Sequence, residues 1–120
     1  MKRILLADDD NDLLTVLADE LTDAGYEVHA VPDGVEAVIE SAERHFDLFL
    51  VDMLMPRMDG PATIKVLRKL APGTPIIAFT GHIGQGYMSR AAAEGVICLS
   101  KPVTTETLLK EIGAALSVKR

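Results

Sequence analysis

The sequence predicts an α/β fold of three layers, in which helices cover both faces of a parallel β-sheet. Short apolar segments alternate with helical patterns along all 120 residues, and strict alternation of this kind produces such a sandwich. Runs such as residues 48–51 are apolar without the alternation of a half-exposed strand. This pattern indicates strands that are buried on both faces, which is typical of a parallel sheet.

Five strands and five helices are expected along the chain. The strands are predicted at residues 3–7, 27–31, 48–51, 76–79 and 96–99. Two helices show apolar residues at helical spacing, namely Leu13, Leu14, Leu17 and Leu21 in the first, and Leu108, Leu109, Ile112 and Leu116 in the last. Three further helices are predicted at residues 34–44, 61–70 and 88–94.

Residues that start and end helices agree with these boundaries. Asp10 is predicted as the N-cap of the first helix, and Gly25 as the residue that closes it. Pro61 suits a first helical turn, and Thr104 is expected to cap the last helix. The fourth helix is expected to be mobile, because it is rich in alanine and follows the glycine-rich residues 81–86.

Composition restricts the class of protein. A chain of this length is expected to form one domain, residues 1–120. Its net charge of −6 disfavours binding to nucleic acid or to an anionic membrane. A single cysteine, Cys98, excludes an internal disulfide, and no apolar run is long enough to cross a bilayer. We therefore expect a cytoplasmic protein.

Polar residues gather at the carboxyl ends of the predicted strands, where sheets of this type bind their ligands. The residues at these ends are Asp8, Asp9 and Asp10 after the first strand, Asp52 after the third, Thr80 after the fourth and Lys101-Pro102 after the fifth. The second strand ends near Asp33 and is expected to contribute little. Carboxylates, a hydroxyl and an ammonium group are therefore expected to meet at one edge of the sheet.

This set of groups suits phosphoryl transfer with Mg²⁺. Carboxylates so close together repel one another unless some are protonated or a cation lies among them. Mg²⁺ prefers one or two carboxylates together with water and phosphate oxygens. The ion, Lys101 and the Thr80 hydroxyl can each meet one oxygen of a phosphoryl group. Asp52 lies centrally in this arrangement and is the best candidate for a carboxylate nucleophile.

Four segments of the chain form an ordered set of motifs, namely residues 4–10, 47–60 (with Met55-Pro56 and Asp59-Gly60), 74–80 and Ser100-Lys101-Pro102. In these segments, and in their order, the chain resembles the response-regulator receiver domains of two-component systems, of the chemotaxis-protein type. The resemblance implies a flavodoxin-like, doubly wound, five-stranded parallel sheet with the strand order 2-1-3-4-5. It also implies a phosphoacceptor switch that is phosphorylated by a sensor histidine kinase or a phosphotransfer protein and signals to a protein partner.

The resemblance further assigns metal ligands. It implies that Asp52 is phosphorylated and that Asp9 and Asp52 bind Mg²⁺ directly. The backbone carbonyl of Leu54 would complete the protein ligands, and Asp8 would act on the metal through water.

The residues that sense the phosphoryl group are also implied, together with one departure from the family pattern. Thr80 and Lys101 are the expected sensors, and the Lys101–Pro102 peptide bond is expected to be cis. Receivers usually carry an aromatic residue three positions before the lysine, whereas this chain has Cys98. Because Cys98 is small, the signal is expected to travel through the backbone of residues 81–88, where His82 lies close to the site.

Three other functions compete with this interpretation. A receiver fold that acts only as a constitutive interaction module has no need of the complete set of acidic and basic residues. A Mg²⁺-dependent phosphatase usually needs a second aspartate two residues after the nucleophile, and position 54 is leucine. A nucleotide-binding protein needs a glycine-rich phosphate loop after the first strand, where this chain has three aspartates. We therefore expect a signalling domain that catalyses only its own phosphotransfer and dephosphorylation.

Overall fold

The computed structural model describes residues 1–81 and 86–117, and these residues contain a five-stranded parallel sheet. The strands lie in the order β2-β1-β3-β4-β5. Their bounds are β1 Arg3–Ala7, β2 Glu27–Val31, β3 Leu48–Asp52, β4 Ile76–Thr80 and β5 Ile97–Ser100. The predicted fold class, a doubly wound sheet of the flavodoxin type with this strand order, is confirmed.

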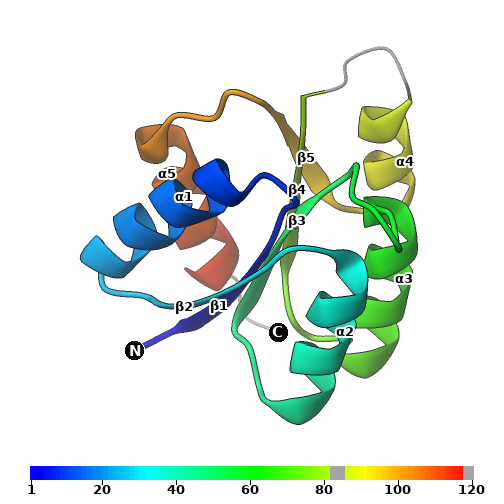
Figure 1. Cartoon of the computed structure of the whole chain (residues 1–120), viewed down its shortest axis with the longest axis horizontal. Coiled ribbons are helices and arrows are strands. Elements are labelled where there is room, and N and C mark those ends of the chain that lie inside the picture. The colour runs from blue at the N-terminus through cyan, green and yellow to red at the C-terminus, as the bar shows by residue number, and fades with distance from the viewer. Residues whose placement is uncertain (82–85, 118–120) are drawn as a thin grey trace.

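Helices cover both faces of the sheet. Figure 1 shows α1 and α5 on one face and α2, α3 and α4 on the other. Their bounds are α1 Asn11–Asp23, α2 Gly34–Glu43, α3 Gly60–Leu70, α4 Tyr87–Ala93 and α5 Thr105–Ser117. The ranges predicted from the sequence agree with these bounds to within one residue.

The sheet separates two apolar cores. The core beneath α2, α3 and α4 includes Phe49 and Ile64, and the core beneath α1 and α5 includes Leu17 and Ile112. Every residue of β3 and β4 is buried, as their continuous apolar runs predict. β5 lies at the edge of the sheet, as the expected strand order implies, and its Ile97 is 56% exposed.

Polar side chains cap four of the helices and so satisfy backbone N–H groups that have no partner within the helix. The carboxylates of Asp10, Asp33 and Asp59 accept hydrogen bonds from the first turns of α1, α2 and α3. The Thr104 hydroxyl accepts from the N–H of Thr107 at 3.1 Å. The caps predicted at Asp10 and Thr104 are therefore confirmed.

Two glycines hold the connection between β3 and α3 (residues 53–59, the β3–α3 loop) in close contact with its neighbours. A Cβ on Gly60 would lie 2.4 Å from the Cα of Met53, and one on Gly34 would lie 2.1 Å from Oγ1 of Thr63. The N–H of Gly60 also donates to the carbonyl of Met53 at 3.0 Å. The loop therefore folds back onto the residue that follows Asp52.

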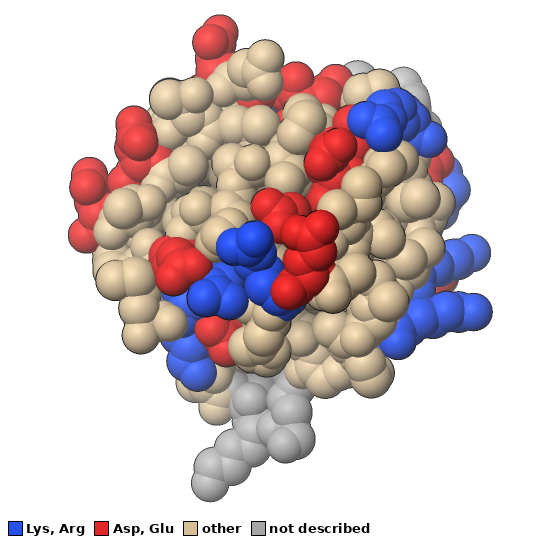
Figure 2. Space-filling view, turned by 60° about the horizontal axis from the view of Figure 1, so that its bottom comes forward, with Lys and Arg blue, Asp and Glu red and all other residues tan. Residues whose placement is uncertain are grey.

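Charged side chains of both signs are mixed on the surface. Figure 2 shows Lys and Arg side chains lying among Asp and Glu side chains near the centre of one face. Exposed ion pairs such as Arg44 with Glu40, 3.3 Å apart, contribute little to stability. Within residues 1–81 and 86–117, none of the helices combines the length and the hydrophobicity that a membrane span requires.

Replacing Gly60 tests how tightly the β3–α3 loop is packed. Gly60→Ala is expected to lower the free energy of unfolding by about 1–3 kcal/mol, because backbone atoms must move to admit the methyl group. Gly113→Ala is the control, since an added Cβ there meets no atom within 4 Å, and replacing a helical glycine raises stability by up to about 1 kcal/mol. Urea unfolding measures both variants, and equal effects would contradict the close contact at Gly60.

Candidate functional site

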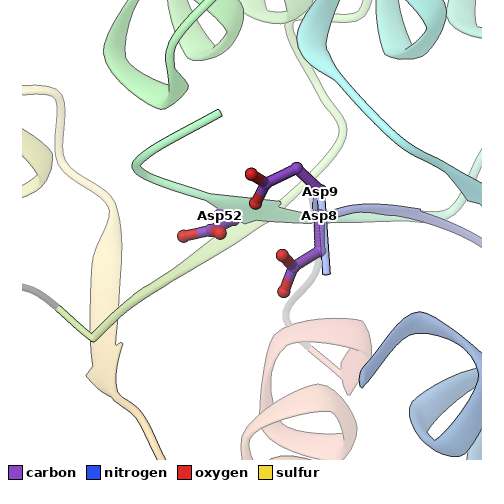
Figure 3. Close-up of side chains that lie close together, drawn as sticks. All are labelled: Asp8, Asp9 and Asp52. Atoms are coloured by element: carbon purple, nitrogen blue, oxygen red, sulfur yellow. The ribbon is translucent and has the colours of Figure 1, made fainter. Parts of the chain in front are cut away.

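Parallel pairing brings the ends of β1 and β3 side by side. Ala7 and Val51 are partners in this ladder, so Asp8 and Asp52, the residues that follow them, lie next to each other at the same edge of the sheet. Asp9 comes directly after Asp8. Figure 3 shows the carboxylates of all three aspartates directed toward one space.

This acidic cluster (Asp8, Asp9 and Asp52) combines two buried carboxylates with an exposed one. Asp8 is 0% exposed and Asp52 is 3% exposed, whereas Asp9 is exposed. One carboxylate oxygen of each residue lies within 4.8 Å of the others. Burial removes the water that would screen their repulsion, so the cluster requires positive charge nearby.

Lys101 supplies one positive charge to the acidic cluster. Its Nζ donates to Oδ2 of Asp8 at 3.0 Å and to Oδ2 of Asp52 at 3.1 Å. The backbone N–H of Lys101 donates to the carbonyl of Thr80 at 2.8 Å, and the peptide bond between Lys101 and Pro102 is cis. The end of β4 therefore fixes the backbone from which the lysine reaches the two aspartates.

The ionisation of Asp52 depends on these neighbours. Burial and the charge of Asp8 raise the pKa of Asp52 to about 7, although Lys101 acts in the opposite direction. Burial alone would lower the pKa of Lys101, but its hydrogen bond with Asp8 and the charge of Asp52 raise it. One ammonium group therefore does not fully compensate the buried carboxylates, and a further cation would favour their ionised forms.

The acidic cluster fits a divalent ion such as Mg²⁺. Mg²⁺ holds oxygen ligands at about 2.0–2.1 Å, so two ligands on opposite sides lie about 4.2 Å apart. Carboxylate oxygens within 4.8 Å of one another reach this geometry after small shifts, or with one of them acting through water. Lys101 contacts Asp8 and Asp52 alike, so the assignment of Asp9 and Asp52 as direct ligands and of Asp8 as a ligand through water stays a prediction.

Two other predicted site residues lie beside Asp52. Thr80 ends β4 and is completely buried, and the N–H of Leu54 donates to Oδ1 of Asp52 at 3.3 Å. The Leu54 backbone is therefore adjacent to the acidic cluster, while coordination by its carbonyl stays a prediction. His82 and the rest of residues 82–85, which belong to the predicted signalling segment, lie outside the described residues.

Cys98 occupies the position at which receiver domains usually carry an aromatic side chain. It is half-buried and packs against the core beneath α2, α3 and α4. Burial, and then the charge of Asp52, raise the pKa of the Cys98 thiol, which keeps the thiol protonated at neutral pH. Cys98 thus contributes a small, uncharged side chain on β5.

One ionic contact near the site was not expected from the sequence. Asp33, from which little was expected, is 5% exposed. One of its oxygens caps α2 by accepting from the N–H of Glu36, and the other accepts from Nη1 of Arg57 at 3.1 Å. The Asp33-Gly34 pair at a helix start signals the cap, but the pairing with Arg57 follows only from the tertiary structure.

The model of the response regulator receiver domain family matches residues 4–113. The chain belongs to this family, which is a family of signalling domains of two-component systems rather than of ordinary enzymes. The resemblance found in the sequence is therefore confirmed. Domains of this family generally bind Mg²⁺ at an acidic pocket, in agreement with the cluster of three aspartates in this chain.

Individual relatives are similar over nearly the whole chain. The response regulator receiver protein CpdR of Brucella abortus is 36% identical over 93% of this chain and 94% of its own length. The structure of the chemotaxis protein CheY4 of Vibrio cholerae superposes with a TM-score of 0.88 at 32% identity, covering 97% of this chain and 99% of that one.

A further solved structure contains a modified aspartate. A response regulator of Burkholderia pseudomallei, 28% identical, has a TM-score of 0.85 over 98% of this chain and 68% of that one, and holds a phosphorylated aspartic acid, a calcium ion and citrate. Other curated relatives, which include transcriptional regulators and sensor histidine kinases, are longer. This chain spans between 9% and 46% of their length.

The raised pKa of Asp52 predicts a pH-dependent effect of its removal. An aspartate in an unfolded chain titrates near pH 3.9, whereas Asp52 has a pKa of about 7 when folded. Between these values only the folded protein holds the proton, so Asp52 lowers the free energy of unfolding increasingly as pH rises. Without metal, Asp52→Asn should therefore stabilise the protein more at pH 8 than at pH 5.

Urea unfolding in the presence of a chelator measures this difference. Asp19→Asn is the matched control, because it removes an exposed carboxylate from α1 and should show no such dependence. An equal gain from Asp52→Asn at both pH values would show that Asp52 is not destabilised by its neighbours.

Proposed function

We propose that this protein is a phosphoacceptor switch that receives a phosphoryl group on Asp52 from a histidine kinase or a phosphotransfer protein in a Mg²⁺-dependent reaction. The position of the Asp52 carboxylate carries this proposal. It lies at the end of the central strand β3, beside Asp8, and one of its oxygens accepts from Nζ of Lys101 at 3.1 Å. A carboxylate with a cation and a metal-binding cluster beside it is suited to act as a nucleophile toward phosphorus.

In the transfer step, an ionised oxygen of Asp52 attacks the phosphorus atom of a phosphohistidine. The new bond joins the carboxylate oxygen to phosphorus, and the bond between phosphorus and the imidazole nitrogen breaks. The electron pair of that bond stays on the imidazole. Hydrolysis reverses the modification, because water attacks the acyl phosphate and releases inorganic phosphate and the free carboxylate.

The residues around Asp52 bind and orient the transferred group. When bound, Mg²⁺ supplies the positive charge that both the carboxylates and the phosphoryl oxygens require. Asp9, Asp52 and the Leu54 carbonyl would hold the ion directly, and Asp8 through water. Phosphorylation removes the anionic Asp52 oxygen that Lys101 contacts, so Lys101 turns to a phosphoryl oxygen, and the Thr80 hydroxyl donates to another.

The relatives support a histidine kinase as donor and a protein as receiver of the signal. Sensor histidine kinases and transcriptional regulators both contain segments similar to this chain. Phosphorylation adds negative charge and strong acceptor oxygens at the carboxyl edge of the sheet, and the displacement of Thr80 and Lys101 changes the surface that a partner binds. The reaction would take place in the cytoplasm, without direct contact to nucleic acid or membrane.

Phosphorylation by a small donor tests the assignment of Asp52. With acetyl phosphate and Mg²⁺, the intact mass should increase by one phosphoryl group, and hydroxylamine should remove it because the product is an acyl phosphate. Asp52→Asn should abolish the increase, whereas Asp19→Asn should retain it. Persistence of the modification in Asp52→Asn would assign the phosphoacceptor to a different residue.

The metal response tests the role of Asp9. Mg²⁺ at a hundredfold excess over Kd should raise the free energy of unfolding of the unmodified protein by about 2.7 kcal/mol. Asp9→Ala should raise stability without metal, since it relieves repulsion, and should abolish the Mg²⁺ response. Asp12→Ala removes an exposed carboxylate in the first turn of α1 and should keep that response. An unchanged response in Asp9→Ala would remove Asp9 from the ligands.

A further inference from the structure

Arg57 adopts a backbone conformation that is unfavourable for its residue type. Its φ is +67°, and among the described residues it is the only one other than glycine with a positive φ. The left-handed region is unfavourable for a residue that carries a Cβ. Strain of this kind persists where the surrounding structure holds the residue in place, and the side chain of Arg57 makes a contact of this kind.

The side chain of Arg57 binds a buried carboxylate that belongs to a different part of the chain. Its Nη1 lies 3.1 Å from Oδ2 of Asp33 and 3.9 Å from Oε1 of Glu36. The side chain of Asp33 is 7% exposed, whereas that of Arg57 is 55% exposed. Because the other oxygen of Asp33 caps α2, loss of Arg57 would leave a buried anionic oxygen without this partner.

The start of α2 and the β3–α3 loop are also in direct contact. A Cβ on Gly34 would lie 2.6 Å from the carbonyl oxygen of Met58, besides meeting Thr63. The Thr63 hydroxyl donates to the carbonyl of Asp59 at 2.7 Å. The second half of the loop is therefore held between α2 and α3, and the ion pair of Arg57 with Asp33 closes this contact.

The first half of the same loop carries the backbone that lies against Asp52. The N–H of Met53 donates to the carbonyl of Phe79 at 2.9 Å, and the N–H of Leu54 donates to the Asp52 carboxylate. Residues 54–57 lie beyond the sheet, in which Val51 pairs with Ala7 and Asp52 pairs with Phe79. The hydrogen bond from Gly60 to Met53 fixes the ends of the loop, and the ion pair of Arg57 fixes its middle.

We propose that Arg57 is a positioning residue, whose ion pair with the buried Asp33 holds the β3–α3 loop closed so that the Leu54 backbone stays in place beside the acidic cluster. The metal-related part of this inference rests on the proposed function, since it concerns the Leu54 carbonyl as a ligand. The loop geometry itself does not require the metal. Arg57 thus acts through the loop and does not contact the reacting atoms.

A purely electrostatic role of Arg57 predicts the opposite effect on metal binding. Arg57 carries a positive charge on the loop that follows Asp52, so removing this charge would strengthen Mg²⁺ binding if charge alone were involved. Removing a positioning residue instead weakens metal binding, typically by on the order of tenfold for groups behind the direct ligands. The sign of the change in affinity therefore distinguishes the two roles.

The test compares four forms of the full chain by NMR: the unmodified protein, Arg57→Asn, Arg57→Lys and Lys65→Gln. Asparagine tolerates the left-handed conformation but does not reach Asp33, whereas lysine retains the charge and the reach. Lys65→Gln removes one exposed positive charge from α3 without touching the loop. Amide hydrogen exchange at Leu54 is measured without metal, and Mg²⁺ affinity is measured by titration.

Arg57→Asn should accelerate amide exchange at Leu54 and weaken Mg²⁺ binding by about tenfold. Arg57→Lys should keep most of the exchange protection and most of the Mg²⁺ affinity. Lys65→Gln should change neither quantity. Unchanged exchange at Leu54, or tighter Mg²⁺ binding in Arg57→Asn, would overturn the positioning role. An unmodified protein that neither binds Mg²⁺ nor is phosphorylated would overturn the proposed function, and the exchange measurement would still decide the role of Arg57 in the loop.

Discussion

The burial of Asp8 and Asp52 beside each other is the constraint on which the rest of the site depends. Both carboxylates are almost completely removed from water, and both share the single ammonium group of Lys101. Desolvated charges of like sign are costly unless a cation and hydrogen bonds compensate them. Lys101 itself is held in place, since its Nζ lies over the Phe79 ring at 5.2 Å from the ring centre. Compensation of the buried charges is therefore as important as apolar packing for the arrangement of the strand ends.

The balance of charge in the site suggests why phosphorylation acts as a switch. When ionised, the three carboxylates of the acidic cluster and the ammonium of Lys101 leave two negative charges, which one divalent ion would balance. In the proposed reaction, a phosphoryl group on Asp52 would replace one negative charge with up to two, so the site would gain negative charge and attract hydrogen-bond donors. Lys101 and Thr80 are the proposed donors, and the N–H of Lys101 donates to the carbonyl of Thr80 where β4 and β5 end.

Features that depend on local sequence were predictable, and features that depend on tertiary contacts were not. The continuous apolar runs of β3 and β4 predicted their burial, and the parallel sheet then placed Asp8 and Asp52 at one edge, since parallel strands share the direction of their carboxyl ends. The strand order implied by the family resemblance already placed β5 at the edge of the sheet, where Ile97 is exposed. The pairing of Asp33 with Arg57 was missed because the two residues lie far apart in the sequence and meet only when α2 packs on α3.

The acidic cluster and the Leu54 backbone beside it are positioned by two different means. Hydrogen bonds between β1 and β3 fix the backbones that lead to Asp8 and Asp52, and these bonds repeat along the whole ladder. Leu54 lies beyond the end of β3, where the ladder no longer constrains the chain, so its position needs a separate anchor. The left-handed backbone of Arg57 is tolerated because it turns the loop toward Asp33, where a buried carboxylate receives the guanidinium group. The strained backbone of Arg57 thus helps to hold the Leu54 backbone in a position that the hydrogen bonds of the sheet alone do not fix.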